Sequence, residues 1–318
     1  MRSSTDQADT PARPGRPRYT RQRNGPLRFL APLLAVLVLL VLITESLALG
    51  SRTLSPEEVW QGFLVYDNSV ASKVVWGLRI HRTILAIVVG ASLAVAGVVM
   101  QALTRNPLAE PGILGVNAGA SLAVVAAIGG LGLTSVNQYL PFAFAGAAAA
   151  AVLVHMMSRR SADSGPARLV LAGVALGASL SSITGTITMY NSKIFDSYRF
   201  WVVGSLENRK LEVLLWVAPF LAVVLVLALA SAHSLNALAL GDEQATALGV
   251  NLAVVRGVAF VALTLLCGAA TAAAGPISFI GLVIPHVVRL LVGADQKHLL
   301  AWSVVAGAGL LLAADVAG

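Results

Sequence analysis

The sequence predicts an all-α fold, a polytopic transmembrane helical bundle. Apolar residues make up 57% of the chain, charged residues only 12%, and the mean hydropathy is +0.80. Soluble domains carry about a quarter charged residues. Long apolar runs recur along the chain, and a run of about 20 such residues matches the thickness of the bilayer core. Only helices and closed barrels satisfy every backbone group there, so these runs indicate membrane-spanning helices.

Residues 1–28 are predicted to form a disordered, Arg-rich cytoplasmic tail. The net charge of the chain is +7, and seven of its 22 lysines and arginines lie in this segment together with four of the 13 prolines. Such a composition buries too little apolar surface to fold. Nucleic-acid binding is the alternative, but no aromatic-bearing module accompanies the arginines. We also considered a signal peptide, but the run that follows is long for one, so we interpret it as a retained first span.

About nine spans are predicted in residues 29–318, which form one transmembrane domain. Their approximate bounds are Phe29–Leu49, Thr83–Leu103, Ile113–Leu133, Leu140–Met157, Leu169–Tyr190, Leu211–Ala232, Leu252–Ala272, Ile277–Val292 and Leu299–Ala314. Glycine is abundant within them, as in helices whose backbones approach closely, and Gly173 and Gly177 form one such small-residue pair. The basic residues of the short loops, among them Arg105 and Lys297, favour a cytoplasmic N-terminus. The bias is moderate, because arginines also lie on the outer side.

The chain lacks the motifs of an enzyme. It contains neither the phosphate-binding G-x-x-x-x-G-K-[ST] pattern nor a zinc pattern, and its single cysteine, Cys267, lies in an apolar run. No catalytic residue, metal or cofactor is therefore expected. The middle of the spans is almost free of charge, whereas proton-coupled transporters usually need such groups. This favours a translocation pathway driven from elsewhere over an ion-coupled secondary transporter or a non-transporting scaffold.

Four segments carry a resemblance to a known family. They are RIHRTILAIVVGASLAVAGVVMQALTRNPLAEPGILG from Arg79, FWVVGSL from Phe200, GDEQATALG from Gly241 and GPISFIGLVIPH from Gly275. Together they resemble the FecCD or BtuC-like permeases of importers for iron-siderophore complexes and vitamin B12, over roughly Leu54–Gly318. The resemblance implies a ten-span fold of which nine spans are present. Because the chain stops at Gly318, the C-terminal span is expected to be missing, as in a fragment or a truncated gene product.

The resemblance also implies roles for individual residues. Arg79 and Arg82, three residues apart at an outer helix start, would receive acidic residues of a substrate-binding protein; the alternative is that they anchor the helix among lipid headgroups. Asn106 and Leu108 would line a cytoplasmic gate, unless they belong to an ordinary tight loop.

The segment Leu235–Val250 would hold the coupling helix of an ATPase subunit, or else a plain amphipathic interfacial helix. The coupling residues implied are Gly241, Asp242, Glu243, Ala245, Leu248 and Gly249.

The function implied is that of a permease subunit of a binding-protein-dependent ABC importer in the bacterial cell membrane. Its substrate would be a ferric siderophore, with cobalamin or haem as the alternative. The partners implied are a second permease subunit, identical or homologous, separate ATPase subunits, an extracytoplasmic substrate-binding protein and the lipid membrane. Nucleic acid is not among them.

Overall fold

The computed structural model describes residues 27–50, 54–65, 69–133, 135–159, 166–206 and 211–318, and all regular elements in these ranges are helices. The predicted all-α fold is confirmed. The predicted Arg-rich tail, residues 1–28, lies outside the described residues except for its last two. Those two belong to α1 (Leu27–Ala48), which begins two residues before the predicted first span.

Six helical stretches are long and apolar enough to cross a membrane. One of them, Val70–Thr104, consists of α3 (Val70–Val74), the π-helical turn η1 (Val75–Arg79) and α4 (Ile80–Thr104). The others are α6 (Val136–Arg159), α7 (Pro166–Tyr190), α9 (Leu211–Ala230), α12 (Leu252–Ala274) and α14 (Gln296–Ala317). Shorter apolar stretches in α1, α5 (Val116–Leu131) and α13 (Ile280–Val292) coincide with the remaining three predicted spans. That all nine cross the bilayer stays a prediction.

Two predicted helix starts were wrong. The second span begins at Val70, since no proline separates Val70 from Arg82 and the helix continues through Gly77 as a π-helical turn, and the two arginines therefore lie inside a continuous helix. The span at Ile277 starts as helix only at Ile280, after Pro276 and the left-handed residue Phe279. The short helix predicted within Leu235–Val250 is present as α11 (Asp242–Ala247), which follows α10 (Ala232–Leu240) after a turn at Gly241.

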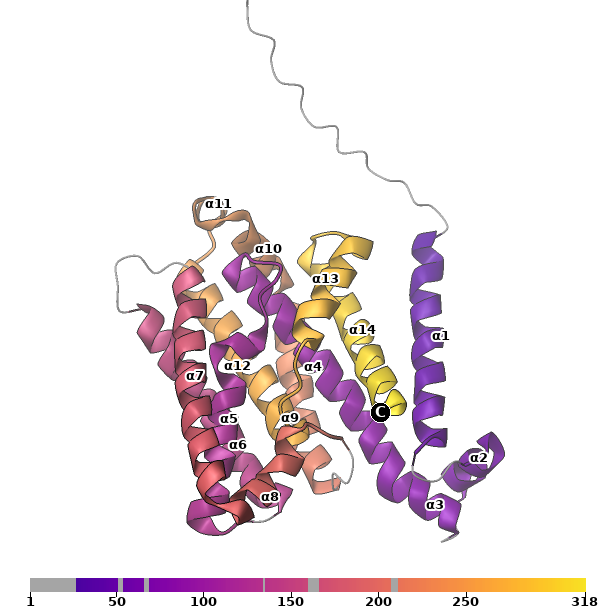
Figure 1. The fold of residues 1–318 in the computed structure, drawn as a ribbon. Coiled ribbons are helices and arrows are strands. Elements are labelled where there is room, and N and C mark those ends of the chain that lie inside the picture. The colour runs from indigo at the N-terminus through magenta and orange to yellow at the C-terminus, as the bar shows by residue number, and fades with distance from the viewer. Residues whose placement is uncertain (1–26, 51–53, 66–68, 134, 160–165, 207–210) are drawn as a thin grey trace, which may run out of the picture.

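Short elements connect the spans. α2 (Pro56–Leu64) follows α1 and opens with a capping box between Ser55 and Glu58. The 3₁₀ turn η2 (Pro111–Leu114) precedes α5, and α8 (Ser192–Val202) follows α7. Figure 1 shows α10, α11 and the N-terminal end of α1 at one end of the bundle, and α2, α3 and α8 at the other. We refer to these as the α11 end and the α8 end.

Helix α4 forms the centre of the bundle and packs against α9, α12, α13 and α14. Its close contact with these helices depends on glycines. A Cβ atom on Gly90 would collide with the carbonyl oxygen of Gly307 in α14, and one on Gly97 with that of Gly281 in α13. On the other side of the bundle, Gly173 of α7 lies against the carbonyl oxygen of Ile113, which confirms the close packing predicted there.

Substitution of Gly97 by alanine should therefore destabilise the bundle. The added methyl group meets backbone rather than a movable side chain, so we expect a loss of about 1–3 kcal/mol. Thermal unfolding in detergent would measure it. The matched control is Gly257→Ala in α12, where nothing lies within 4 Å of the new atom. Equal melting temperatures for the two variants would contradict the packing described.

Candidate functional site

A network of charges surrounds Asp242, the first residue of α11. Arg256 of α12 donates to both of its carboxylate oxygens, at 2.7 and 2.8 Å, and Arg105 forms a further ion pair with it. Partial burial opposes ionisation of Asp242, but the hydrogen bonds and charges of Arg256 and Arg105 outweigh that effect and lower its pKa. Arg105 Nε also donates to the carbonyl oxygen of Leu238 in α10, at 3.2 Å. One arginine at the end of α4 thus holds both α10 and α11.

The turn between α10 and α11 presents a small surface at the α11 end. Gly241 adopts φ +115°, which L side chains rarely adopt, and lets the chain reverse within one residue. Ala245 is fully buried and fixes α11 to the bundle, whereas Glu243, Leu248 and Gly249 are exposed. The surface available to a partner therefore consists of these last three residues and their exposed neighbours, and Ala245 supports it from below.

Helix α10 is also fixed to the start of α14. The side-chain amide of Asn236 donates to Asp295 at 3.0 Å, and its oxygen accepts from the backbone N–H of Gln296 at 2.9 Å. The hydrogen bonds from Asn236 and from the backbone of Lys297 lower the pKa of Asp295. The elbow formed by α10 and α11 is thus attached to α4, α12 and α14.

The loop that contains Asn106 and Leu108 lies beside this elbow. Arg105 is left-handed, with φ 50°, and the Asn106 side chain accepts from the backbone N–H of Leu108 at 2.9 Å. The Leu108 side chain is 64% exposed. Glu110 accepts from the backbone N–H of Phe279 at 2.8 Å, just before α13. The loop is therefore tied to α11 through Arg105 and to α13 through Glu110.

Arg79 and Arg82 lie toward the α8 end and turn toward neighbouring helices. Arg79 is 5% exposed and donates to the carbonyl oxygen of Leu47 in α1, at 2.5 Å. Arg82 Nε lies 2.6 Å from a carboxylate oxygen of Asp315 in α14. Both guanidinium groups are thus engaged within the chain, and their docking role stays a prediction.

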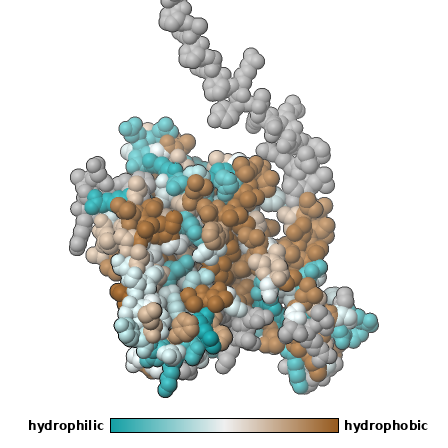
Figure 2. Space-filling model, viewed as in Figure 1, coloured by the Kyte–Doolittle hydropathy of each residue, from teal (hydrophilic) through white to brown (hydrophobic). Residues whose placement is uncertain are grey.

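The second half of α7 exposes hydroxyl groups alongside apolar side chains such as Ile183 and Met189. α7 is the least buried of the six long helices, with 11% of its most apolar stretch buried, against 83% in Val70–Thr104. The hydroxyl groups of Ser179, Ser182 and Thr186 donate to carbonyl oxygens one turn back and leave their own oxygens as acceptors on this face. Figure 2 shows a pale surface over the lower part of α7, whereas α13 and α1 are brown.

The structure brings the predicted gate and coupling residues together and leaves the two arginines of the α8 end apart from them. Sequence reasoning treated Arg105 only as evidence of orientation and did not consider Arg256 or the α7 hydroxyls. The run Ser179–Thr188, in which six of ten residues carry hydroxyl groups, was a usable signal for these hydroxyls. In the part of the chain that the structure describes, no group of three or more His, Cys, Asp or Glu side chains could hold a metal.

Comparison with known proteins identifies the family. A model of the FecCD transport family matches residues 37–318. The chain is 42% identical to the ferric enterobactin transport system permease protein FepD of Escherichia coli (strain K12), covering 89% of this chain and 85% of that protein. It is 38% identical to the Fe(3+)-citrate import system permease protein YfmD of Bacillus subtilis (strain 168), over 94% and 89%. The vitamin B12 import system permease protein BtuC of Yersinia enterocolitica (serotype O:8 / biotype 1B, strain NCTC 13174 / 8081) is 40% identical, over 93% and 86%.

The fold has a solved counterpart. The chain is similar to an inward-facing transporter assigned to the metal-chelate type of ABC transporters, with a TM-score of 0.78, 29% identity and coverage of 89% of this chain and 88% of the other. Permeases of this kind work in a membrane and with ATPase subunits. The chain therefore belongs to the FecCD transport family and is a multi-pass membrane permease.

Proposed function

We propose that this permease imports ferric siderophores across the bacterial cell membrane, with separate ATPase subunits supplying the energy. The observation that carries the proposal is the family match over residues 37–318, together with relatives named for ferric enterobactin and Fe(3+)-citrate transport. Cobalamin and haem are the alternative substrates, since relatives named for vitamin B12 and hemin transport are 40% and 36% identical. No described side chain singles out one ligand.

The α11 end is proposed as the cytoplasmic, ATPase-facing side. The exposed turn at Glu243, Leu248 and Gly249 would sit in a groove of the ATPase subunit, and Arg105 would pass its movement to the gate loop at Asn106 and Leu108. ATP can drive such a change only through contacts that differ between the two states of the transporter. A shared arginine is suited to this, because it contacts the elbow and begins the loop.

The pathway is proposed to run along α7 between two permease copies, identical or homologous. A polar chelate crossing the membrane needs hydrogen-bonding partners and water, and α7 exposes the hydroxyl groups of Ser179, Ser182 and Thr186 among its apolar side chains. A substrate-binding protein would dock at the α8 end. Arg79 and Arg82 could receive its acidic residues only after exchanging their present partners, Leu47 and Asp315.

The substrate assignment predicts the outcome of an uptake assay. Cells that lack this gene should lose uptake of radioiron-labelled siderophore while keeping uptake of labelled cobalamin and haem, and reintroduction of the gene should restore it. Loss of cobalamin uptake alone would identify cobalamin as the substrate instead of a siderophore, and loss of haem uptake alone would identify haem. Unchanged uptake of all three would contradict the importer assignment.

Substitution of Asp242 by asparagine should impair transport more than stability. The side chains of Asp242, Arg105 and Arg256 are 46%, 33% and 39% exposed, so solvent screens their charges. We therefore expect the free energy of unfolding to change by less than about 1 kcal/mol. Disturbing a coupling element should lower the uptake rate by about 2- to 30-fold. Uptake by cells and thermal unfolding of the purified variant would measure the two effects.

The matched control is Glu57→Gln, which removes an exposed carboxylate from α2 at the α8 end, away from the network and from the proposed ATPase surface. Because the pKa of Asp242 is lowered, its stabilising contacts persist above its ordinary value of 3.8 and are lost only as pH falls below it. The defect of Asp242→Asn should therefore be constant across the neutral pH range. A defect that disappears within that range, or an equal defect in the control, would argue against the network.

The pathway proposal predicts which positions water reaches. In a Cys267→Ala background, Ser182→Cys on α7 should react with a membrane-impermeant thiol reagent about tenfold faster or more than Val223→Cys on α9, because a thiolate forms only where water can solvate it. Both side chains are exposed in the single chain, so burial within it does not separate them. Equal labelling of the two cysteines would place α7 in lipid instead.

A further inference from the structure

A cavity of about 590 Å³ opens between α6 and α9 near the α8 end. Its wall is almost wholly apolar. Phe144 of α6 and Phe220 of α9 meet edge to face inside it, with ring centroids 5.7 Å apart, and Ala269 and Ala272 of α12 close its base. The size lies within the range of about 300–1,000 Å³ that small-molecule sites occupy.

The mouth of the cavity is polar and negatively charged. Glu212 lies in the first turn of α9, and one of its carboxylate oxygens accepts from the side-chain amide of Asn137 at 3.3 Å. Trp216, one turn further along α9, is 80% exposed beside the cavity, a typical place for tryptophan at the membrane surface. The site thus combines an apolar trough with an acidic, hydrogen-bonding rim at the end of two spans.

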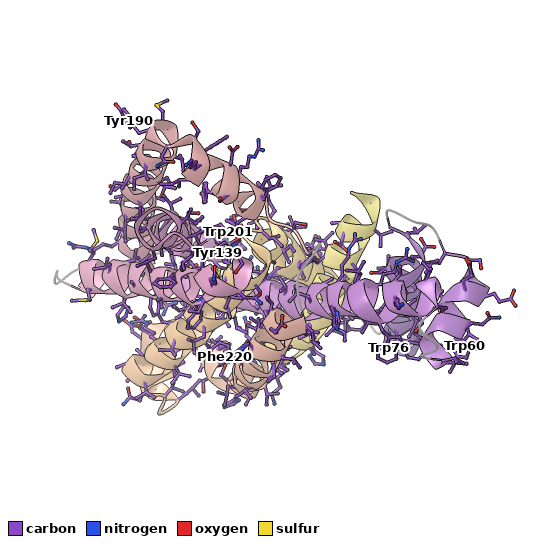
Figure 3. The ribbon with its side chains drawn as sticks, turned by 90° about the horizontal axis from the view of Figure 1, so that it is seen from below. Trp60, Trp76, Tyr139, Tyr190, Trp201 and Phe220 are labelled. Atoms are coloured by element: carbon purple, nitrogen blue, oxygen red, sulfur yellow. The ribbon has the colours of Figure 1, made fainter. Side chains whose placement is uncertain are left out.

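The cavity lies on the side of the bundle that faces away from α7. Figure 3, seen from below, shows Tyr190 at the end of α7 on one margin and Phe220 on the opposite margin. If a second permease copy covers α7, as proposed above, the cavity faces lipid. α6 and α9 are both long and apolar enough to span the membrane, and 28% and 33% of their most apolar stretches are buried within the chain.

We propose that this cavity binds one acyl chain of a phospholipid whose headgroup carries a primary amine, such as phosphatidylethanolamine. The acyl chain fills the apolar trough and packs against Phe144, Phe220 and the alanines of α12, as lipid-exposed apolar surfaces in a membrane pack. The headgroup ammonium donates a charge-assisted hydrogen bond to Glu212. An anionic headgroup, in contrast, places its net negative charge beside the carboxylate and is disfavoured. The assignment of the lipid-facing side depends on the proposed function, whereas the chemistry of the cavity does not.

Quenching of tryptophan by brominated lipids tests this inference. The full chain is placed in phosphatidylcholine nanodiscs that contain the same small mole fraction of either phosphatidylethanolamine or phosphatidylglycerol with dibrominated acyl chains. The Trp216 signal is the difference between the wild type and Trp216→Phe. We expect phosphatidylethanolamine to quench it about twofold more than phosphatidylglycerol. This excess should disappear in Glu212→Gln and persist in Glu57→Gln, which removes a carboxylate from α2 outside the cavity.

Equal quenching of the wild type by the two lipids would overturn the proposal, because the contact would then be ordinary annular lipid. An excess that persists in Glu212→Gln would also overturn it. Poor quenching by either lipid would also overturn the proposal, because protein such as a partner subunit would then cover the cavity. The wild-type comparison stands even if a variant folds poorly. Since the readout requires no transport, its failure and a failure of siderophore uptake are distinguishable.

Discussion

The close approach of α4 to α13 and α14 is the constraint on which the rest of the structure depends. Apolar surface gains nothing from burial against protein rather than lipid, so helices in a membrane associate through packing and hydrogen bonds. α4 meets this requirement with glycines placed opposite glycines, Gly90 against Gly307 and Gly97 against Gly281. A polar contact reinforces the packing, because Gln101 accepts from Arg289 of α13 at 2.8 Å. These contacts fix the position of α4 in the bundle. The position of α4 in turn determines where the segments at its two ends lie.

The arrangement at the α11 end explains how a partner could act on the pathway without touching it. Arg105 directly follows α4, binds the elbow of α10 and α11, and begins the loop at Asn106. Glu110 ends that loop and contacts the backbone before α13. Displacement of the elbow must therefore strain the loop or carry it along. At the α8 end, Arg82 and Asp315 join α4 to α14, so a partner that competes for Arg82 would act on the same central helix from the other side.

The fold could be predicted from the sequence because long uncharged runs leave the chain few alternatives to spanning helices. Local breaks were harder to predict. The helical start at Val70 was missed because Lys73 and Gly77 interrupt the apolar run there, although the helix continues past them through α3 and a π-helical turn. The split at Gly241 was missed because one glycine is compatible with a helix end or a turn. The coupling and gate segments were predicted from a resemblance. Their link through Arg105, Asp242 and Arg256 was not, since Arg105 and Asp242 are 137 positions apart and only the tertiary fold pairs them.

The most direct test of this account is the distance between the elbow and the gate loop during the transport cycle. Spin labels at Glu243 and Pro107, both exposed, would report it by pulsed electron paramagnetic resonance in a Cys267→Ala background, with ATPase subunits and with or without ATP. The account predicts that ATP leaves this distance within one chain unchanged while the distance between the Pro107 labels of two copies changes. A change in the distance within one chain, with the loops of the two copies at rest, would contradict the claim that Arg105 couples the elbow to the gate.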